Sequence, residues 1–294
     1  KFVRLIFILC ILLNVLVAMI FKIFPWYKVD VRRAIVINYF TCVATAWLTD
    51  FSNFNASLPH LGEMIHWSLP MGIMFFTVFV VIGKTVANHG VMVATTSQKL
   101  SLIIPVLVAL IFFGETLTPW KISGLMAAVM AVVFINSNGS FGLSSALLKT
   151  TFSLPFLTWL GSSMVDLSLF LSERKGVSAD HGLLFTASLF GFAGLTGLIY
   201  VMIQDFKSGE KWSRIDVIAG IMLGIPNFFS IYLIVVLLAG GWQGSVLFPM
   251  LNVSIILLTT LTGIFLFKED FTSNRIKGFV LAVAAIVLLS LPWK

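Results

Sequence analysis

The stretch Phe112–Ile135, "FFGETLTPWKISGLMAAVMAVVFI", returns later in the chain as Leu266–Leu289, "LFKEDFTSNRIKGFVLAVAAIVLL". The two copies are 154 positions apart, and each one runs from a short polar turn into a long apolar segment. Positions of equal charge or size coincide: Glu115 with Glu269, Lys121 with Arg275, and Gly124 with Gly278. This pair of segments predicts an internal repeat.

The repeat extends toward the N-terminal side of both copies. At the same shift Gly90 meets Gly244 and Gln98 meets Asn252. With small loop insertions Asn14 lies over Asp166, and Asp50 lies over Asp205. We therefore predict that the whole chain is two copies of one unit.

The composition identifies the kind of protein in which this repeat lies. Of 294 residues 59% are hydrophobic and only 11% are charged, whereas soluble domains carry roughly a quarter charged residues. The net charge of +7 comes from basic residues that cluster at helix ends, which we interpret as membrane anchoring rather than nucleic-acid binding. We expect a multi-pass integral membrane protein of the bacterial cytoplasmic (inner) membrane.

Apolar runs recur along the whole chain at the length of about 20 residues that a helix needs to cross a bilayer. None alternates as a transmembrane β-strand does, so the predicted fold is all-α. The ten predicted spans are 4–24, 33–50, 67–87, 91–113, 120–137, 154–172, 183–203, 215–237, 245–267 and 276–291.

Five spans per copy is an odd number, so the second copy must enter the membrane from the opposite face. The predicted fold class is ten transmembrane helices in two inverted five-helix repeats, with residues 1–138 as the first repeat, 139–153 as linker and 154–294 as the second. Inverted repeats are typical of secondary transporters, in which the two repeats together surround a site near the bilayer midplane. We expect alternating access as the mechanism.

Three features resemble the drug/metabolite transporter superfamily, EamA-like branch. They are the five-plus-five layout, the spacing from Pro105 to Glu115 with its echo "FKEDFTSNRIKG", and the short link Asn88-His89-Gly90. The stretch "SQKLSLIIP" is also similar to a Gln-x-Lys element of nucleotide-sugar transporters, although here Gln98 and Lys99 are adjacent. The resemblance implies a central cavity lined by helices one to four and six to nine, with helices five and ten peripheral.

Lys99 is the charged residue that stands out, because no other charge lies between positions 91 and 113. An ionised side chain at mid-membrane costs about 2.5 kcal/mol or more, so it must face protein or water. Thr95, Thr96 and Lys99 share one face of the predicted fourth helix, and Pro105 interrupts the backbone hydrogen bonds beyond them. We expect Lys99 to bind substrate or a coupling group; a purely structural lysine is the alternative.

Asp166 is the second charge inside a span. It follows Thr158 and Ser162 at four-residue steps on the sixth helix, which predicts a polar wall. Two roles are open: Asp166 neutralises Lys99, or it carries a coupling proton.

The predicted substrate site collects the polar side chains of the cavity helices. Each of them could instead bond only to a neighbouring helix. The predicted binding residues are Asn14, Asn38, Thr95, Gln98, Lys99, Asp166, Asn227, Tyr232 and Asn252, with Asp166 also as the coupling residue.

The chain carries no phosphate loop, nucleophile triad or metal-ligand pattern, so we expect a transporter without cofactor or metal rather than an enzyme. The expected substrate is a small polar or amphipathic solute, and the positive charge of Lys99 favours an anion. A lipid-carrier flippase is the main alternative, and a membrane-embedded enzyme is the more distant one. The remaining expected partners are membrane lipids and a second copy, which would dimerise through helices five and ten.

Overall fold

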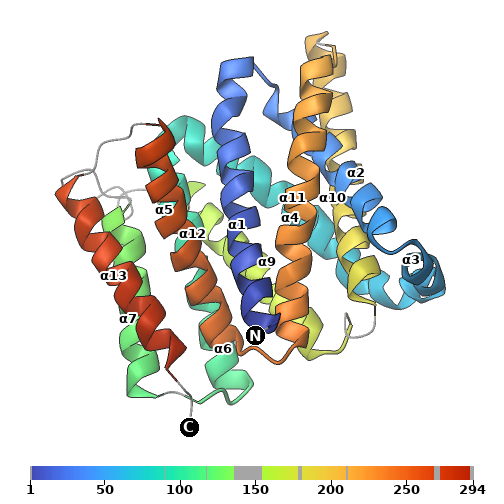
Figure 1. Cartoon of the computed structure of the whole chain (residues 1–294). Coiled ribbons are helices and arrows are strands. Elements are labelled where there is room, and N and C mark those ends of the chain that lie inside the picture. The colour runs from blue at the N-terminus through green and yellow to red at the C-terminus, as the bar shows by residue number, and fades with distance from the viewer. Residues whose placement is uncertain are drawn as a thin grey trace. The chain divides into compact units, whose positions relative to one another are not determined.

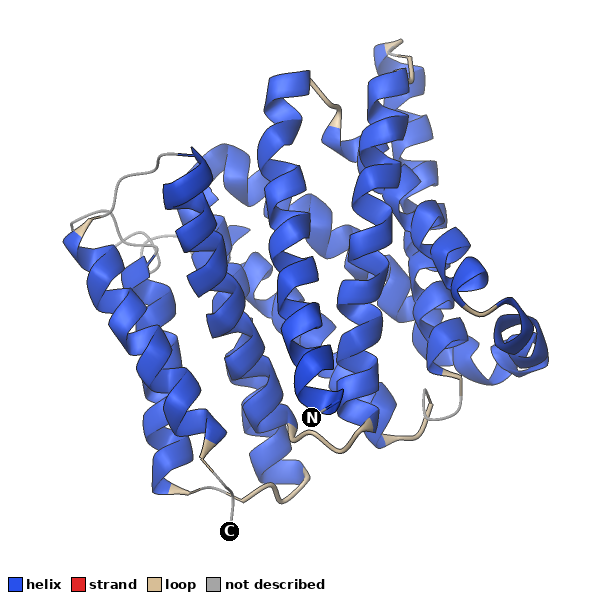
Figure 2. Cartoon of the chain, viewed as in Figure 1, coloured by secondary structure: helices blue, strands red, loops and turns tan. Residues whose placement is uncertain are grey.

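A computed structural model describes residues 2–89, 91–116, 118–135, 154–177, 181–209, 211–267 and 272–291. Throughout these residues the regular elements are helices, as the sequence predicts (Figure 2). The predicted linker 139–153 and Glu269 lie outside the described residues.

Eight of the described helices are long and apolar enough to cross a membrane, so the chain is a multi-pass integral membrane protein. These spans are Arg4–Tyr27, Phe51–Val86, Val93–Phe112, Leu154–Arg174, Gly182–Ser208, Arg214–Ala239, Gly244–Leu266 and Ser273–Ser290. The predicted fifth span corresponds to a shorter apolar helix, Pro119–Ile135.

The elements follow one another along the chain as labelled in Figure 1. The first half contains α1 (Phe2–Ile23), η1 (Phe24–Tyr27), α2 (Val31–Thr49), α3 (Phe51–Ser57), η2 (Leu58–His60), α4 (Leu61–His89), α5 (Val91–Lys99), η3 (Leu100–Leu102), α6 (Ile103–Phe112) and α7 (Pro119–Ile135). The second half contains α9 (Leu154–Arg174), α10 (Gly182–Ser208), α11 (Arg214–Ala239), α12 (Gly244–Phe267) and α13 (Ser273–Ser290).

Side-chain caps explain where several helices begin. The Thr118 hydroxyl accepts a hydrogen bond from the Lys121 amide (3.3 Å), with Pro119 as the first residue of α7, as its Thr-Pro sequence predicts. Asp50 caps α3 by accepting from the Asn53 amide at 3.0 Å. That short helix is absent from the predicted spans, because its sequence "FSNFNAS" has no apolar periodicity.

The helices pack into two compact units. The first unit contains Lys1–Thr77 and Leu171–Gly240, and the second contains Val78–Phe170 and Gly241–Lys294. The division falls within α4 and α9, so each of these helices contributes to both units. Both units therefore combine segments from the two predicted repeats.

In the first unit α2 packs against α10 and α11, and α1 packs against α11. Two glycines four residues apart let α2 and α11 approach closely. A Cβ atom on Gly220 would lie 2.6 Å from the Ala34 carbonyl oxygen, and one on Gly224 would lie 2.5 Å from Thr41 Cβ. Small residues at this spacing are a common device for close helix contact in membranes.

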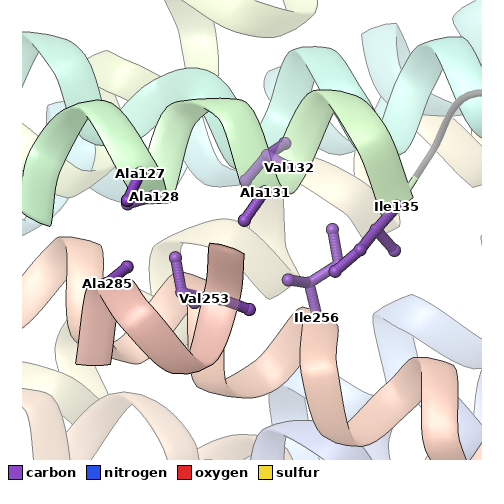
Figure 3. Close-up of a cluster of buried hydrophobic side chains, with 9 residues drawn as sticks. Ala127, Ala128, Ala131, Val132, Ile135, Val253, Ile256 and Ala285 are labelled. Carbon is purple, nitrogen blue, oxygen red and sulfur yellow. The ribbon is translucent and has the colours of Figure 1, made fainter. Parts of the chain in front are cut away.

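In the second unit α7 packs along α13, and α12 contacts α6, α7 and α13. Figure 3 shows the apolar cluster at this junction, where Ala128 and Val132 of α7 meet Val253 of α12 and Ala285 of α13. A Cβ atom on Gly278 would lie only 2.6 Å from Ile135 Cγ1. The small residues of α7 and α13 therefore pack against each other within one chain.

Candidate functional site

The helix that carries Lys99 is broken immediately after it. A 3₁₀ turn, η3, separates α5 from α6, one turn before Pro105. Proline lacks the N–H that would bond to the Ser101 carbonyl, so the regular helix cannot continue through this turn. The sequence predicts an interruption beyond Lys99, and the structure places it at Leu100–Leu102, where the Trp159 indole donates to the Leu100 carbonyl at 3.1 Å.

Lys99 contacts one other predicted site residue. Its Nζ donates to Asn252 Oδ1 of α12 at 3.3 Å, and both side chains are half-buried. Asn252 is neutral, so this hydrogen bond gives the ammonium an acceptor but not a counter-charge. This pair joins two residues that the sequence assigned to the substrate site.

Asp166 lies near Lys99 without forming an ion pair with it. The two charges interact electrostatically, but the hydrogen bond to Asp166 comes from the Ser101 hydroxyl of η3 at 2.7 Å. Among the described residues Ser101 is the one donor to this carboxylate. Direct neutralisation, one of the two predicted roles, is therefore not the arrangement seen here.

Ser101 is a site residue that the sequence reasoning missed. It is two positions from Lys99, so it falls on a different helical face and outside the stripe of Thr95, Thr96 and Lys99. The signal that could have found it is Pro105, which predicts a local change in helical phase between Lys99 and Pro105.

The remaining predicted residues of α5 are half-buried. Gln98 has no hydrogen-bond partner among the described residues, which leaves its amide available to a ligand. Thr95 lies one turn before Lys99 on the same helical face.

A second polar cluster lies in the first unit. The Asn227 amide of α11 donates to Asn38 Oδ1 of α2 at 3.2 Å, and the Cys42 thiol donates to the Gly224 carbonyl at 3.3 Å. Asn38 is fully buried, and its Nδ2 has no partner among the described residues. The structure therefore brings together two more of the predicted amides.

Asn14 and Tyr232, also in the first unit, make other contacts. Asn14 Nδ2 donates to the Cys10 carbonyl of its own helix at 2.8 Å. The Tyr232 ring stacks on Phe228 with centroids 5.5 Å apart. Neither side chain is joined by a hydrogen bond to another predicted site residue.

Glu115 forms a set of hydrogen bonds that helps to fix the second unit. The turn before it includes Gly114 at φ +62°, a left-handed conformation that suits glycine. The buried carboxylate accepts from the Gly244 and Ser245 amides at 3.0 Å each, and from the Ser245 hydroxyl. Glu115 therefore caps α12, which lies far along the chain, rather than the next helix, α7.

Lys121 is buried beside this cap. Its Nζ donates to the Thr116 carbonyl and to Gln243 Oε1, both at 2.9 Å. The turn between α6 and α7 is thereby fastened to the residues that precede α12.

Arg33 forms the corresponding ionic cluster of the first unit. Its guanidinium donates to both oxygens of Asp205 (3.2 and 2.8 Å) and to the Lys211 carbonyl at 2.6 Å. Asp216 lies 3.9 Å away. The interpretation of this arginine as a membrane anchor is wrong, because it is only 5% exposed and is held by carboxylates.

Asp30 caps α2 at the edge of the same cluster. Burial opposes its ionisation, but hydrogen bonds and charge from Arg32, with a further contribution from Arg33, lower the pKa of this carboxyl group. Asp30 therefore stays ionised and accepts from the Arg32 amide at 2.9 Å.

Within the described residues no group of three or more His, Cys, Asp or Glu side chains is placed to hold a metal ion.

Comparisons with known proteins find a bacterial relative and a solved structure with a similar fold. No family model matches the chain. The chain is 28% identical over 291 residues to an uncharacterized protein of Haemophilus influenzae, with 96% of each chain covered. A solved crystal structure is similar with a TM-score of 0.68 and 16% identity, covering 98% of this chain and 96% of that one, so this likeness shows the fold alone.

Proposed function

We propose that this chain is a secondary transporter of the drug/metabolite superfamily, EamA-like branch, working by alternating access in the bacterial cytoplasmic membrane. The observation that carries the proposal is Lys99, an ammonium inside an apolar span that has an amide partner and, among the described residues, no ion pair. The Haemophilus influenzae relative supports a bacterial setting for this proposal.

The proposed architecture is ten spans in two inverted repeats, with α2 and α7 as the two spans that complete the ten. Packing within each unit supports it, because predicted repeat partners lie against each other. The partners that pack together are α2 with α10, α6 with α12, and α7 with α13.

Reciprocal contacts also support the repeat. In the first unit α1 meets α11, where Cys10 Sγ donates to the Ser230 carbonyl at 3.3 Å. The exchanged pair, α9 with α4, meets in the second unit through the Thr85 and Thr158 hydroxyls, 2.7 Å apart. Gly224 of α11 and Gly72 of α4 are 152 positions apart, and each is a close-contact glycine against the other repeat's helix.

The proposed substrate is a small polar or amphipathic anion, a carboxylate or a phosphate. Such a group supplies the counter-charge that the Asn252 amide cannot give, and its hydrogen bond to an ammonium is roughly twice as strong as a neutral one. The Gln98 amide on α5 offers further hydrogen bonds. A cationic solute would be repelled by Lys99.

Asp166 is proposed as the coupling residue. Its carboxylate is held by the neutral Ser101 hydroxyl, so it can gain a proton without breaking an ion pair. When it is protonated, its attraction for Lys99 disappears and the ammonium is more attractive to a substrate anion. The variant Asp166→Asn should therefore reduce the dependence of uptake on a pH gradient.

The test is uptake into proteoliposomes. A thermal-shift screen of carboxylates, phosphates and amines selects the probe, and its uptake is then compared in wild type, Lys99→Met and Lys84→Met. Lys84 is the matched control because it is exposed near the end of α4. We expect uptake to fall more than about tenfold in Lys99→Met, which requires only about 1.4 kcal/mol. Normal uptake by Lys99→Met would overturn the anion proposal.

A lipid-carrier flippase is the second candidate, and one observation favours it. A groove of about 310 Å³ lies between α6 and α7 and is lined by apolar side chains, including Leu102, Val106 and Met126. It begins three residues after Lys99, so an amphipathic substrate could use both. Transfer of fluorescent phospholipid between leaflets, with no uptake of soluble anions, would favour this candidate.

A further inference from the structure

Four hydroxyl groups lie along the contact that α9 makes with α4 and η3 in the second unit. Thr158 and Ser162 precede Asp166 at four-residue steps, so all three share one face of α9. Thr85 of α4 continues the row at one end through its 2.7 Å contact with Thr158, and Ser101 completes it at Asp166. We call Thr85, Thr158 and Ser162 the hydroxyl column.

Ser162 differs from the other serines of this helix. The Ser163 hydroxyl bonds to the Trp159 carbonyl and the Ser168 hydroxyl to the Met164 carbonyl, as serines in apolar helices usually do. Ser162 is 6% exposed, and its hydroxyl has no partner among the described residues. It is therefore not hydrogen bonded to its own helix, and its four-residue spacing from Asp166 places it on the same face of α9.

A buried hydroxyl without a partner costs about 1 to 3 kcal/mol, and the ordinary solution is a bound water. Side chains four residues apart on a helix have Cβ atoms about 5–6 Å apart, a gap that one water bridges. Waters on either side of Ser162 would connect Thr158, Ser162 and Asp166 into one hydrogen-bonded chain.

The column also has the right direction to reach an aqueous face. Thr85 lies one turn before the end of α4 at His89, and Thr158 lies one turn after the start of α9 at Leu154. Asp166 is twelve residues from Leu154, which is about 18 Å of helix and about the middle of a bilayer. The hydroxyl column therefore covers the depth between one membrane face and Asp166.

We propose that the hydroxyl column, with bound water, is a proton path between Asp166 and the membrane face where α4 ends and α9 begins. This rests on the proposed function, in which Asp166 is the coupling residue. The carboxylate takes a proton from the nearest water, each hydroxyl passes one proton on as it receives another, and one proton moves in total from the aqueous side to Asp166.

The charges around the column favour a proton over a metal cation. Lys99 is the charged group whose field reaches Asp166, and it would repel a sodium ion placed there. Lys84 and His89 are the titratable groups of α4 nearest the outer end of the column, and both are exposed. A proton avoids the conflict with Lys99 because it converts the carboxylate to a neutral acid.

The test measures protonation of Asp166 in the purified protein without any substrate. Infrared spectra after a rapid pH jump follow the carboxylic acid band that Asp166→Asn removes. The variants Ser162→Val and Ser162→Thr introduce side chains of the same size. Only threonine keeps the hydroxyl, so the pair separates the effect of the hydroxyl from the effect of volume. Ser163→Ala is the control for a hydroxyl already bonded to its own helix.

We expect protonation to slow by about tenfold or more in Ser162→Val, and to change by less than about twofold in Ser162→Thr and Ser163→Ala. A second isosteric change, Thr158→Val, should also slow it. Equal rates in Ser162→Val and Ser162→Thr, whether both fast or both slow, would overturn the proton path. Because this readout needs no anion, normal uptake by Lys99→Met would remove the anion proposal and leave the path in place.

Discussion

Each unit holds a basic side chain away from solvent, Arg33 buried in the first and Lys99 half-buried in the second, but the two side chains have different partners. In the first unit the Arg33 guanidinium is hydrogen bonded to both oxygens of Asp205, with Asp216 close by. In the second unit the Lys99 ammonium is bonded to one amide oxygen, and the nearby Asp166 is bonded to a hydroxyl. The first arrangement is closed and satisfied, whereas the second leaves both charges able to bind something else.

The difference teaches how to separate structural from functional charge in a membrane protein. A planar guanidinium with a carboxylate fits the bidentate geometry that fixes two helices together. A flexible ammonium near an unpaired carboxylate costs desolvation energy that this packing does not return. Such a pair is expected where the charges act on a substrate or a proton.

The largest effect on stability is expected from Arg33→Met. This change leaves Asp205 and Asp216 buried without their counter-charge, a loss of about 3–5 kcal/mol in the free energy of unfolding. Unfolding in a denaturant series of detergent-solubilised protein gives the measurement. Arg32→Met is the control, because the Arg32 side chain is 42% exposed and its pair with Asp30 contributes about 1 kcal/mol or less.

If Arg33→Met unfolds like Arg32→Met, the cluster of the first unit is not structural and the comparison fails. The double variant Arg33→Met with Asp205→Asn should recover part of the stability, because it removes one of the two uncompensated charges.

A smaller loss is expected from Glu115→Gln, which tests a paired charge in the second unit. An amide can accept only with its oxygen, so one α12 amide loses its acceptor and the helix N-terminus loses a negative charge. We expect about 2 kcal/mol of lost stability by the same denaturant series. Glu63→Gln is the control, because the Glu63 side chain is 77% exposed. Equal stability of the two variants would contradict the capping role.

The helical fold was predictable because hydropathy alone shows which segments can lie in a bilayer. The start of α7 was also predictable, because a threonine cap followed by proline commonly begins a helix. The position of the helix break after Lys99 was less predictable, because proline disturbs the turn before it rather than its own position. The bounds of α3 were missed because a polar cap and not an apolar pattern defines that helix.

The candidate site was predictable only in part. Lys99 and Asp166 stood out because charges inside spans are costly, and the repeat identified Asn252 as the counterpart of Gln98. The partner of each charge was not predictable. Glu115 and Ser245 are 130 residues apart and Arg33 and Asp205 are 172 apart, and no periodicity or spacing connects such positions.

The smallest effect on stability is expected from Lys99→Met. Replacing the ammonium by an apolar side chain removes a desolvated charge, but it also loses one hydrogen bond to Asn252 and the attraction to Asp166. These effects oppose each other, so stability should change by less than about 1 kcal/mol. Asp166→Asn should behave alike, because Ser101 can still donate to the amide oxygen. The denaturant series used for Arg33→Met gives a direct ranking of all three variants. A loss in Lys99→Met as large as that in Arg33→Met would mean that Lys99 holds the second unit together as Arg33 holds the first. Unchanged stability together with lost anion uptake would instead identify Lys99 as a charge kept for its ligand.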